Sequence, residues 1–309
     1  MMISSVLAGF VLFWPAVLVL FFIGFCCIVF AIFLVGSTVL VSSIFLYGLY
    51  CILRDLGLLD WVFQRIGTLS QMVSGHVKEN VEKSFVFQDL RTSSKEKPCL
   101  YLCHPHGLYG LTWFIHFASR LSAFPDKERP VLAVHSIFFQ LPILRELFQA
   151  HHCIEANESE IKATLQKGTS VALLVGGIEE LLCTEANVLN LVLRKREGYA
   201  RIAKEMQVNL VPLVSPGETN LFPSTQDPLW KWMETWLYER WRLAFPLPSW
   251  KSLSSWIQIA YKPFAKPLIT YILEPVEPDG MSLEDIKSAY INRLETFSKI
   301  HTIPIAFKG

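Results

Sequence analysis

The chain has 309 residues, a formal net charge of +1 and 52% hydrophobic residues. This composition is too hydrophobic for an ordinary soluble enzyme and too polar for a protein made only of membrane spans, and the near-zero charge gives no ground for a nucleic-acid partner. Acidic, basic and histidine residues are absent from Met1 to Leu53, and charges begin at Arg54. We therefore predict a membrane anchor over residues 1–53 and a second domain over residues 54–309.

The uncharged segment exceeds the roughly 20 residues of one bilayer crossing and approaches the length of two. A turn at residues 36–38 would give a helical hairpin with spans near residues 5–33 and 39–53. One long tilted helix, or a second segment that enters without crossing, also fits this length. Because the first basic residue, Arg54, follows the anchor, the positive-inside rule predicts a cytosolic second domain. The seven cysteines are an odd number without the spacing of a disulfide framework, which agrees with a reducing compartment.

Beyond the anchor, apolar runs of strand length alternate with helical patterns. The predicted strands cover residues 99–103, 130–134, 170–175, 209–214 and 267–273. Helical patterns cover residues 142–149, 158–168 and 282–300. Continuous apolar strands separated by helices are typical of a mostly parallel sheet covered on both faces, so the predicted fold class is α/β.

Two glycine-flanked polar clusters follow two of these strands. "HPHG" (104–107) comes after the first strand, and "GGIEE" (176–180) comes after the third. Ligands of such sheets bind at the carboxyl ends of the strands. We expect His106 to act as a general base that Glu180 orients, and His104 to shape the loop or assist an oxyanion. The alternative is that both histidines are hydrogen-bonded loop residues.

Main-chain N–H groups near the glycines would stabilise a developing oxyanion. The predicted donors belong to Gly107, Gly176 and Gly177. Cys103 could suggest an acyl-enzyme route, but a small apolar residue at the end of a buried strand is the favoured interpretation. The sequence His151-His152-Cys153 hints at a metal, but consecutive residues cannot easily share one ion, so no metal site is predicted.

A tryptophan-rich segment over residues 229–256 carries six of the nine tryptophans. Leu229, Trp232, Trp236 and Leu243 fall on one side of a predicted helix, as expected of a helix that lies in the headgroup layer of a bilayer. An aromatic helix inside the core is the alternative.

Four stretches occur in a fixed order: "HPHG", "FFQLPILRE" (138–146), "VALLVGGIEELL" (171–182) and "REGYARIAKEMQVNLVPLVSPGETNLF" (196–222). Behind an N-terminal apolar hairpin, this set resembles the type-2 diacylglycerol acyltransferase family, which includes monoacylglycerol and wax-alcohol acyltransferases. The resemblance implies a glycerolipid-acyltransferase-like α/β domain, a catalytic histidine at His106 and a glutamate at Glu180. It also implies an endoplasmic-reticulum enzyme that moves acyl groups from acyl-CoA to neutral alcohols, as in triacylglycerol synthesis.

Two departures from related patterns bear on the substrate. The wider glycerolipid acyltransferase superfamily has an aspartate five residues after the histidine, where this chain has Leu111, so Glu180 is the expected substitute. Asn157 stands where the family usually has an arginine, between two glutamates. These acidic side chains would repel a phosphorylated acceptor, whereas an uncharged lipid alcohol could hydrogen-bond to Asn157.

A single histidine can suffice for this reaction, because a thioester is a good electrophile and only the alcohol needs a base. Acyl-CoA is then a co-substrate, and no cofactor is required. Arg194, Lys195 and Arg196 would bind its phosphates, although they also fit the solvated start of a helix.

Two other functions remain open: a membrane-bound zinc hydrolase that uses both histidines and a glutamate, and a non-catalytic hairpin protein that binds lipid or shapes membranes. The sequence leaves open the acceptor, the acyl-chain length and the oligomeric state, a homo-oligomer included.

Overall fold

The structure is a computed structural model that describes residues 37–58, 75–92, 98–119, 121–124, 129–222, 227–242, 244 and 262–308. The predicted span near residues 5–33 lies outside these ranges, as do Leu243 and most of the tryptophan-rich segment beyond it. The predicted span at 39–53 corresponds to helix α3 (Ser37–Asp55). Within the described residues, we find no helix that is both long and apolar enough to cross a membrane.

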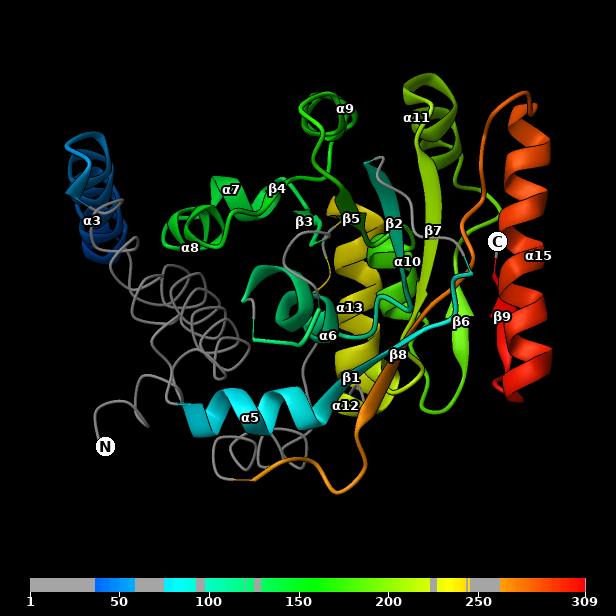
Figure 1. Ribbon diagram of the computed structural model, residues 1–309. Helices are drawn as coiled ribbons and strands as arrows, with labels where there is room; N and C mark the ends of the chain where they lie inside the picture. The colour runs from blue at the N-terminus through cyan, green and yellow to red at the C-terminus, as the bar shows by residue number, and fades with distance from the viewer. Residues whose placement is uncertain are drawn as a thin grey trace.

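A seven-stranded sheet forms the centre of the domain (Figure 1). Its spatial order is β1 (Phe85–Asp89), β8 (Leu268–Ile272), β7 (Asn209–Val214), β2 (Cys99–His104), β5 (Val171–Leu173), β3 (Val131–Val134) and β4 (Ile154–Glu155). The five strands from β7 to β4 are parallel, whereas β8 is antiparallel to β7 and β1 is parallel to β8. The predicted α/β class and mostly parallel sheet are confirmed, and β1 and β4 are strands that the sequence patterns did not predict.

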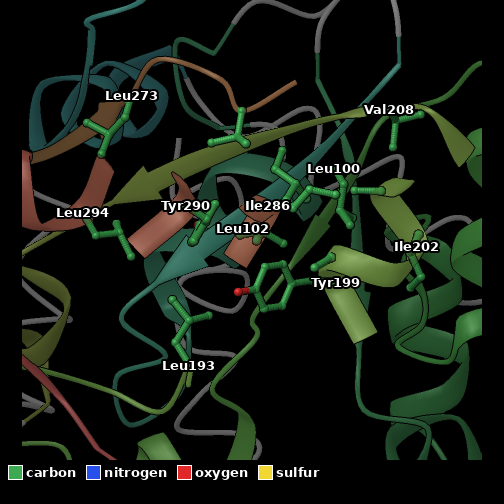
Figure 2. Packing of buried hydrophobic residues seen from close by; sticks show 14 of the residues in the cluster. Leu100, Leu102, Leu193, Tyr199, Ile202, Val208, Leu273, Ile286, Tyr290 and Leu294 are labelled. Carbon is green, nitrogen blue, oxygen red and sulfur yellow. The ribbon is translucent and has the colours of Figure 1, made fainter. Parts of the chain in front are cut away.

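The central strand β2 is buried along its whole length because its side chains alternate between two apolar layers. Leu100 and Leu102 pack in the layer that Figure 2 shows, under three helices. These helices are α9 (Glu158–Gln166), α11 (Gly198–Met206) and α15 (Leu283–His301). Cys99, Tyr101 and Cys103 point into the second layer.

The second layer is covered by short helical elements. They are α6 (Leu111–Trp113), the π-helical turn η1 (Phe114–Ala118), α7 (Ile137–Gln140) and α8 (Leu144–Ala150). Helix α3 contacts this side of the domain, because the Tyr50 hydroxyl donates a 2.8 Å hydrogen bond to Oε1 of the buried Glu146 on α8. A third apolar cluster joins α5 (Gly75–Ser84) to the loop that follows β2.

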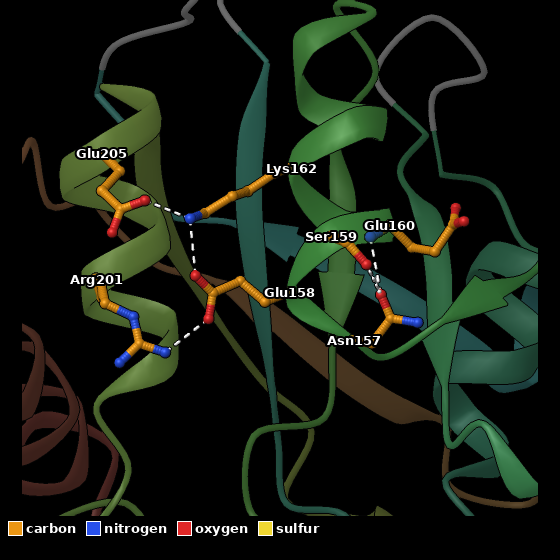
Figure 3. A network of polar contacts seen from close by, with 7 residues as sticks. All are labelled: Asn157, Glu158, Ser159, Glu160, Lys162, Arg201 and Glu205. Carbon is orange, nitrogen blue, oxygen red and sulfur yellow. Dashed lines mark hydrogen bonds and ion pairs between the residues drawn. The ribbon is translucent and has the colours of Figure 1, made fainter.

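Ion pairs fix α9 against α11 on the surface (Figure 3). Glu158 lies 2.6 Å from Arg201 and 2.7 Å from Lys162, and Lys162 also contacts Glu205. Each pair is partly exposed and contributes little stability by itself. Together the pairs link the two helices at the surface.

Four further elements follow β5 or β7 along the chain. They are α10 (Gly177–Leu182), β6 (Leu189–Leu191), α12 (Glu218–Leu221) and α13 (Pro228–Trp241). Strand β6 pairs with β9 (Ile305–Phe307) in a separate two-stranded parallel ribbon. Through this ribbon, residues near the C-terminus support the segment that follows β6.

Candidate active site

Strand β2 ends with a fully buried histidine, His104. The His104 ring shares a 2.9 Å hydrogen bond through Nε2 with the hydroxyl of Tyr290 on α15, while its Nδ1 has no partner within the described residues. Burial lowers the pKa of His104 to about 3, so its ring is neutral at physiological pH. His104 therefore points away from the carboxyl edge into the core, which fits the predicted loop-shaping role and leaves it no access to an oxyanion.

His106 is half-buried at the edge of the sheet. Its Nδ1 lies 2.9 Å from the carbonyl oxygen of Gly107. Because a carbonyl can only accept, Nδ1 carries the proton and Nε2 keeps its lone pair. Burial lowers the pKa of His106 below its ordinary value, although the Gly107 bond opposes this shift. The ring is therefore neutral near pH 7, with the Nε2 lone pair that a general base needs.

Glu180, on α10, contacts His106 in a way that differs from the prediction. Its Oε1 accepts the main-chain N–H of His106 at 2.6 Å, and its Oε2 accepts that of Val192 at 3.1 Å. The predicted contact with the imidazole is not observed, because the carboxylate reaches the loop from the main-chain side. Burial raises the pKa of Glu180 to about 7. Glu180 thus ties the His106 loop to the segment that follows β6.

Gly176 is required by the position of this carboxylate. A Cβ placed on Gly176 would lie 1.8 Å from Oε2 of Glu180, so any other residue would displace the carboxylate. Gly176 therefore serves close packing beneath the loop.

Glu218 is a buried site residue that the sequence analysis missed. It lies on α12, after β7, and its two carboxylate oxygens accept the main-chain N–H groups of Leu111 and Thr112 at 3.0 and 2.9 Å. Its side chain also packs on Gly107. The signal that could have found it is the one used for the other clusters: a polar residue after Pro216-Gly217 at the end of a predicted strand.

The predicted oxyanion donors lie at this edge of the sheet. Within the described residues, the main-chain N–H groups of Gly107, Gly176 and Gly177 have no hydrogen-bond partner. Gly107 and Gly177 adopt φ values of +63° and +58°, a backbone conformation that favours glycine. The protein itself therefore does not use these N–H groups within the described residues, and their role toward an oxyanion stays a prediction.

The three predicted cationic residues separate in the structure. Arg196 lies 3.5 Å from Glu179 and donates a 3.4 Å hydrogen bond to the carbonyl of Gly176, so it belongs to the site. Arg194 and Lys195 are exposed, and the Arg194 guanidinium lies 5.7 Å from the ring centre of Phe307 on β9. Arg196 therefore lies beside the glycines of the site, whereas Arg194 and Lys195 lie on the surface.

Asn157 does not present its amide as the prediction required. It is the N-cap of α9: its Oδ1 accepts the main-chain N–H of Glu160 at 2.8 Å and the Ser159 hydroxyl at 2.8 Å (Figure 3). Its Nδ2 donates a 3.1 Å bond to Glu155. Since β4 lies at the far edge of the sheet, three strands from β2, the structure does not bring Asn157 to His106.

The thiol of Cys103 is not activated. Cys103 is fully buried in the second apolar layer, and burial raises its pKa well above the ordinary value. Its thiolate is therefore too scarce for nucleophilic catalysis, as the favoured interpretation expected. Among the residues with described positions, no group of three or more His, Cys, Asp or Glu side chains could hold a metal ion.

The fold and the site together define an α/β protein with a half-buried histidine at the carboxyl edge of its parallel strands. The sequence profile described as "Diacylglycerol acyltransferase" matches residues 75–302. The chain belongs to the diacylglycerol acyltransferase family, and the resemblance drawn from its motifs is confirmed.

Individual relatives carry several acceptor names. Human acyl-CoA wax alcohol acyltransferase 2 is 34% identical over 129 residues, which cover 40% of this chain and 39% of that protein. Diacylglycerol O-acyltransferase 2 of Dictyostelium discoideum is 24% identical, covering 67% and 66%. Mouse 2-acylglycerol O-acyltransferase 1 is 25% identical, covering 64% and 63%. The chain thus spans about two fifths to two thirds of these relatives.

Among solved structures, the 1-acyl-sn-glycerophosphate acyltransferase PlsC of Thermotoga maritima is similar, with a TM-score of 0.43 and 13% sequence identity, covering 96% of each chain.

Proposed function

We propose that this chain transfers a fatty acyl group from acyl-CoA to the hydroxyl group of a neutral lipid alcohol, with His106 as the general base. Family membership supports the reaction class. The observation that carries the proposal is the state of His106, whose Nδ1–H is bound by the Gly107 carbonyl while Nε2 has no partner among the described residues. A neutral ring held in this tautomer is ready to accept a proton.

The reaction is a single displacement. Nε2 of His106 takes the proton of the acceptor hydroxyl while the hydroxyl oxygen attacks the thioester carbonyl. The N–H groups of Gly107, Gly176 and Gly177 stabilise the oxyanion of the tetrahedral intermediate. When the intermediate collapses, the C–S bond breaks and the leaving thiolate recovers the proton from Nε2. The products are an ester and free CoA.

Charges around the site support this choice of substrates. The exposed Arg194 and Lys195 would bind phosphates of acyl-CoA, whereas Arg196 is already paired near the glycines. Because Asn157 is used as a helix cap and Glu155 lies on β4, three strands from β2, the case for an uncharged acceptor rests on the names of the relatives. Diacylglycerol, monoacylglycerol and long-chain alcohols are the proposed acceptors.

We propose that helix α13 binds the domain to the cytosolic face of the endoplasmic-reticulum membrane. Leu229, Trp232 and Trp236 expose 73%, 63% and 45% of their surface on one side of this helix. Such an aromatic face suits the headgroup layer, where it would bring the site to a water-insoluble acceptor. The anchor predicted over residues 1–53 would act together with it.

The test is an assay of labelled acyl-CoA with diacylglycerol, monoacylglycerol, hexadecanol and lysophosphatidate at matched chain length in one detergent. We expect transfer to one or more of the neutral acceptors and little to lysophosphatidate. His106→Ala should lower kcat by about 10²- to 10⁴-fold, the usual contribution of a general base. His135→Ala is the matched control, because His135 is an exposed histidine at the end of β3. Near-normal turnover of His106→Ala would refute the mechanism.

Two further measurements separate the alternatives. Cys103→Ala should retain activity, which would favour direct transfer over an acyl-enzyme. Metal analysis of the active protein distinguishes this enzyme from a zinc hydrolase, which needs a bound ion.

The pH dependence of kcat/KM reports the ionisation of the base in the free enzyme. Since burial lowers the pKa of His106, the neutral form persists below pH 6.5. Glu180, which holds the His106 loop, has a pKa raised to about 7, so we expect activity to begin to fall near pH 7, before His106 itself is protonated. Activity that does not change between about pH 8 and about pH 4 would contradict His106 as the base.

A further inference from the structure

The loop that carries His106 has no carboxylate of its own. From His106 to Trp113 the sequence is His-Gly-Leu-Tyr-Gly-Leu-Thr-Trp, without an acidic residue. The imidazole bonds to a carbonyl, and Glu180 binds the main chain of the loop at its start. Neither of these contacts holds the end of the loop, at Leu111 and Thr112.

Glu218 binds the end of this loop from another strand. Its oxygens accept the N–H groups of Leu111 and Thr112, where the helical segment of α6 and η1 begins. These N–H groups have no carbonyl partner inside the helix, so a carboxylate both satisfies them and interacts favourably with the positive end of the helix dipole. Glu218 is only 1% exposed, and both of its oxygens are used in this way.

The same side chain supports Gly107 directly. A Cβ placed on Gly107 would lie 2.5 Å from Cγ and 2.7 Å from Oε1 of Glu218. The glutamate therefore fills the space behind the residue whose carbonyl binds Nδ1 of His106. If Glu218 withdrew, Gly107 would lose its support, and the tautomer and direction of the His106 ring would no longer be fixed.

Burial of this carboxylate is costly, which argues against a purely passive role. Burial raises the pKa of Glu218 to about 7, and no cation contributes to that shift. A neutral glutamine could fill the same volume, but its NH₂ group would face one of the two main-chain donors, leaving a donor without an acceptor. Only a carboxylate matches both N–H groups.

We propose that Glu218 is the positioning residue of the His106 loop, supplying from the end of β7 the carboxylate that the loop lacks. It acts through Gly107 and through the start of α6, not by contact with substrate. The catalytic meaning of this role rests on the proposed acyl transfer.

The test compares Glu218→Gln with Glu146→Gln in the full chain. Glu146 is a matched control, since it is also buried, at 2% exposure, but lies on α8 and bonds to Tyr50. Glu218→Gln should lower kcat by about 10- to 100-fold, the scale of a displacement of roughly 1 Å at a reacting group, with little change in the KM for acyl-CoA. Glu146→Gln should keep kcat within about twofold of the parent enzyme, even where its melting temperature falls equally.

A second readout follows His106 without any turnover. Diethyl pyrocarbonate modifies unprotonated ring nitrogens, and peptide mass spectrometry gives its rate at His106 relative to the exposed His135. We expect this ratio to rise several-fold in Glu218→Gln and to stay unchanged in Glu146→Gln. If the parent chain transfers no acyl group to any acceptor, the proposed function fails, while this ratio still tests the position of His106.

Glu218→Asp covers the case in which the glutamine variant does not fold. It keeps the charge but withdraws the carboxylate by one methylene, and its kcat should fall between those of the parent and Glu218→Gln. The proposal is overturned if a folded Glu218→Gln has normal kcat and an unchanged ratio. It is also overturned if both Glu218 variants fail to fold, since the residue is then structural.

Discussion

Helices α13 and α15 begin in the same way. In α15, the Ser282 hydroxyl accepts the N–H of Asp285 at 3.1 Å, and the Asp285 carboxylate accepts the N–H of Ser282 at 3.3 Å, which completes a capping box. In α13, Asp227 accepts the N–H of Trp230 at 2.9 Å, and Pro228 opens the first turn. Local sequence therefore specifies both starts equally well.

The apolar face of α15 is buried, whereas the apolar face of α13 is exposed. Helix α15 buries Ile286, Tyr290 and Leu294 against the sheet (Figure 2), and Phe297 is buried in the same cluster. Helix α13 buries Glu234, whereas Leu229, Trp232 and Trp236 are exposed. The first helix completes the core of the domain, and the second leaves an apolar face exposed. Substitutions in α15 should therefore lower stability, whereas those on the outer face of α13 should affect contact with lipid.

The largest effect is expected from Leu294→Ala. Leu294 is fully buried in the layer between α15 and the sheet. Removing its side chain leaves a cavity and should lower the free energy of unfolding by about 2–5 kcal/mol. Denaturant titration in detergent measures this value, and a loss below about 1 kcal/mol would mean that α15 is not part of the core.

A smaller loss is expected from Tyr290→Phe, which keeps the ring but removes the hydroxyl bound to His104. A buried ring nitrogen is then left without a partner, at a cost of about 1–3 kcal/mol. Tyr199→Phe is the matched control, because the Tyr199 hydroxyl is buried and has no partner within the described residues. Equal unfolding free energies for the two variants would show that the His104 bond contributes nothing.

The two caps test the similarity of the helices. Ser282→Ala and Asp227→Ala each remove an acceptor from a first-turn N–H, and each should cost about 0.5–2 kcal/mol. Melting curves of the two variants should therefore shift by similar amounts. A large shift for Ser282→Ala alone would show that α13 is uncoupled from the cooperative unit.

The smallest change in stability is expected from Trp232→Ala and Trp236→Ala. Both side chains are exposed, so the free energy of unfolding in detergent should stay within about 0.5 kcal/mol. Flotation of the variants with phospholipid vesicles should decrease, as should transfer to an acceptor presented in those vesicles. Thr235→Ala, an exposed position on the same helix, is the control. Unchanged flotation would disprove the proposed contact with the bilayer.

The sequence predicted the elements whose pattern is local and strong. The apolar runs at 99–103 and 209–214 are β2 and β7, and the pattern at 282–300 is α15. It missed β1 because Phe-Val-Phe-Gln-Asp is not a continuous apolar run and only its first residue is buried. It could not give the reversed direction of β8, since strand direction depends on pairings far apart in the chain. The cap formed by Asn157 was readable from Glu160, three residues later, but the residue was assigned to the acceptor instead.

The candidate site was predicted in its location more than in its contacts. The rule that ligands bind at strand ends brought His106 and Glu180 together correctly. It could not tell whether a carboxylate meets an imidazole or the main chain behind it, because that depends on backbone dihedral angles in the glycine turns. For the same reason, the partnership of Glu218 with Gly107 spans 111 positions and has no pattern in the sequence.

Because β6 pairs with β9, the segment that follows β6 depends on residues that are synthesised much later. Strand β6 pairs with β9 alone within the described residues, and the N–H of Lys308 donates to the carbonyl of Leu191, directly before Val192, which binds Glu180. A ribosome makes residues 189–196 more than a hundred positions before β9. In a growing chain, the segment that carries Val192 therefore lacks the support of β9 until those later residues have been made.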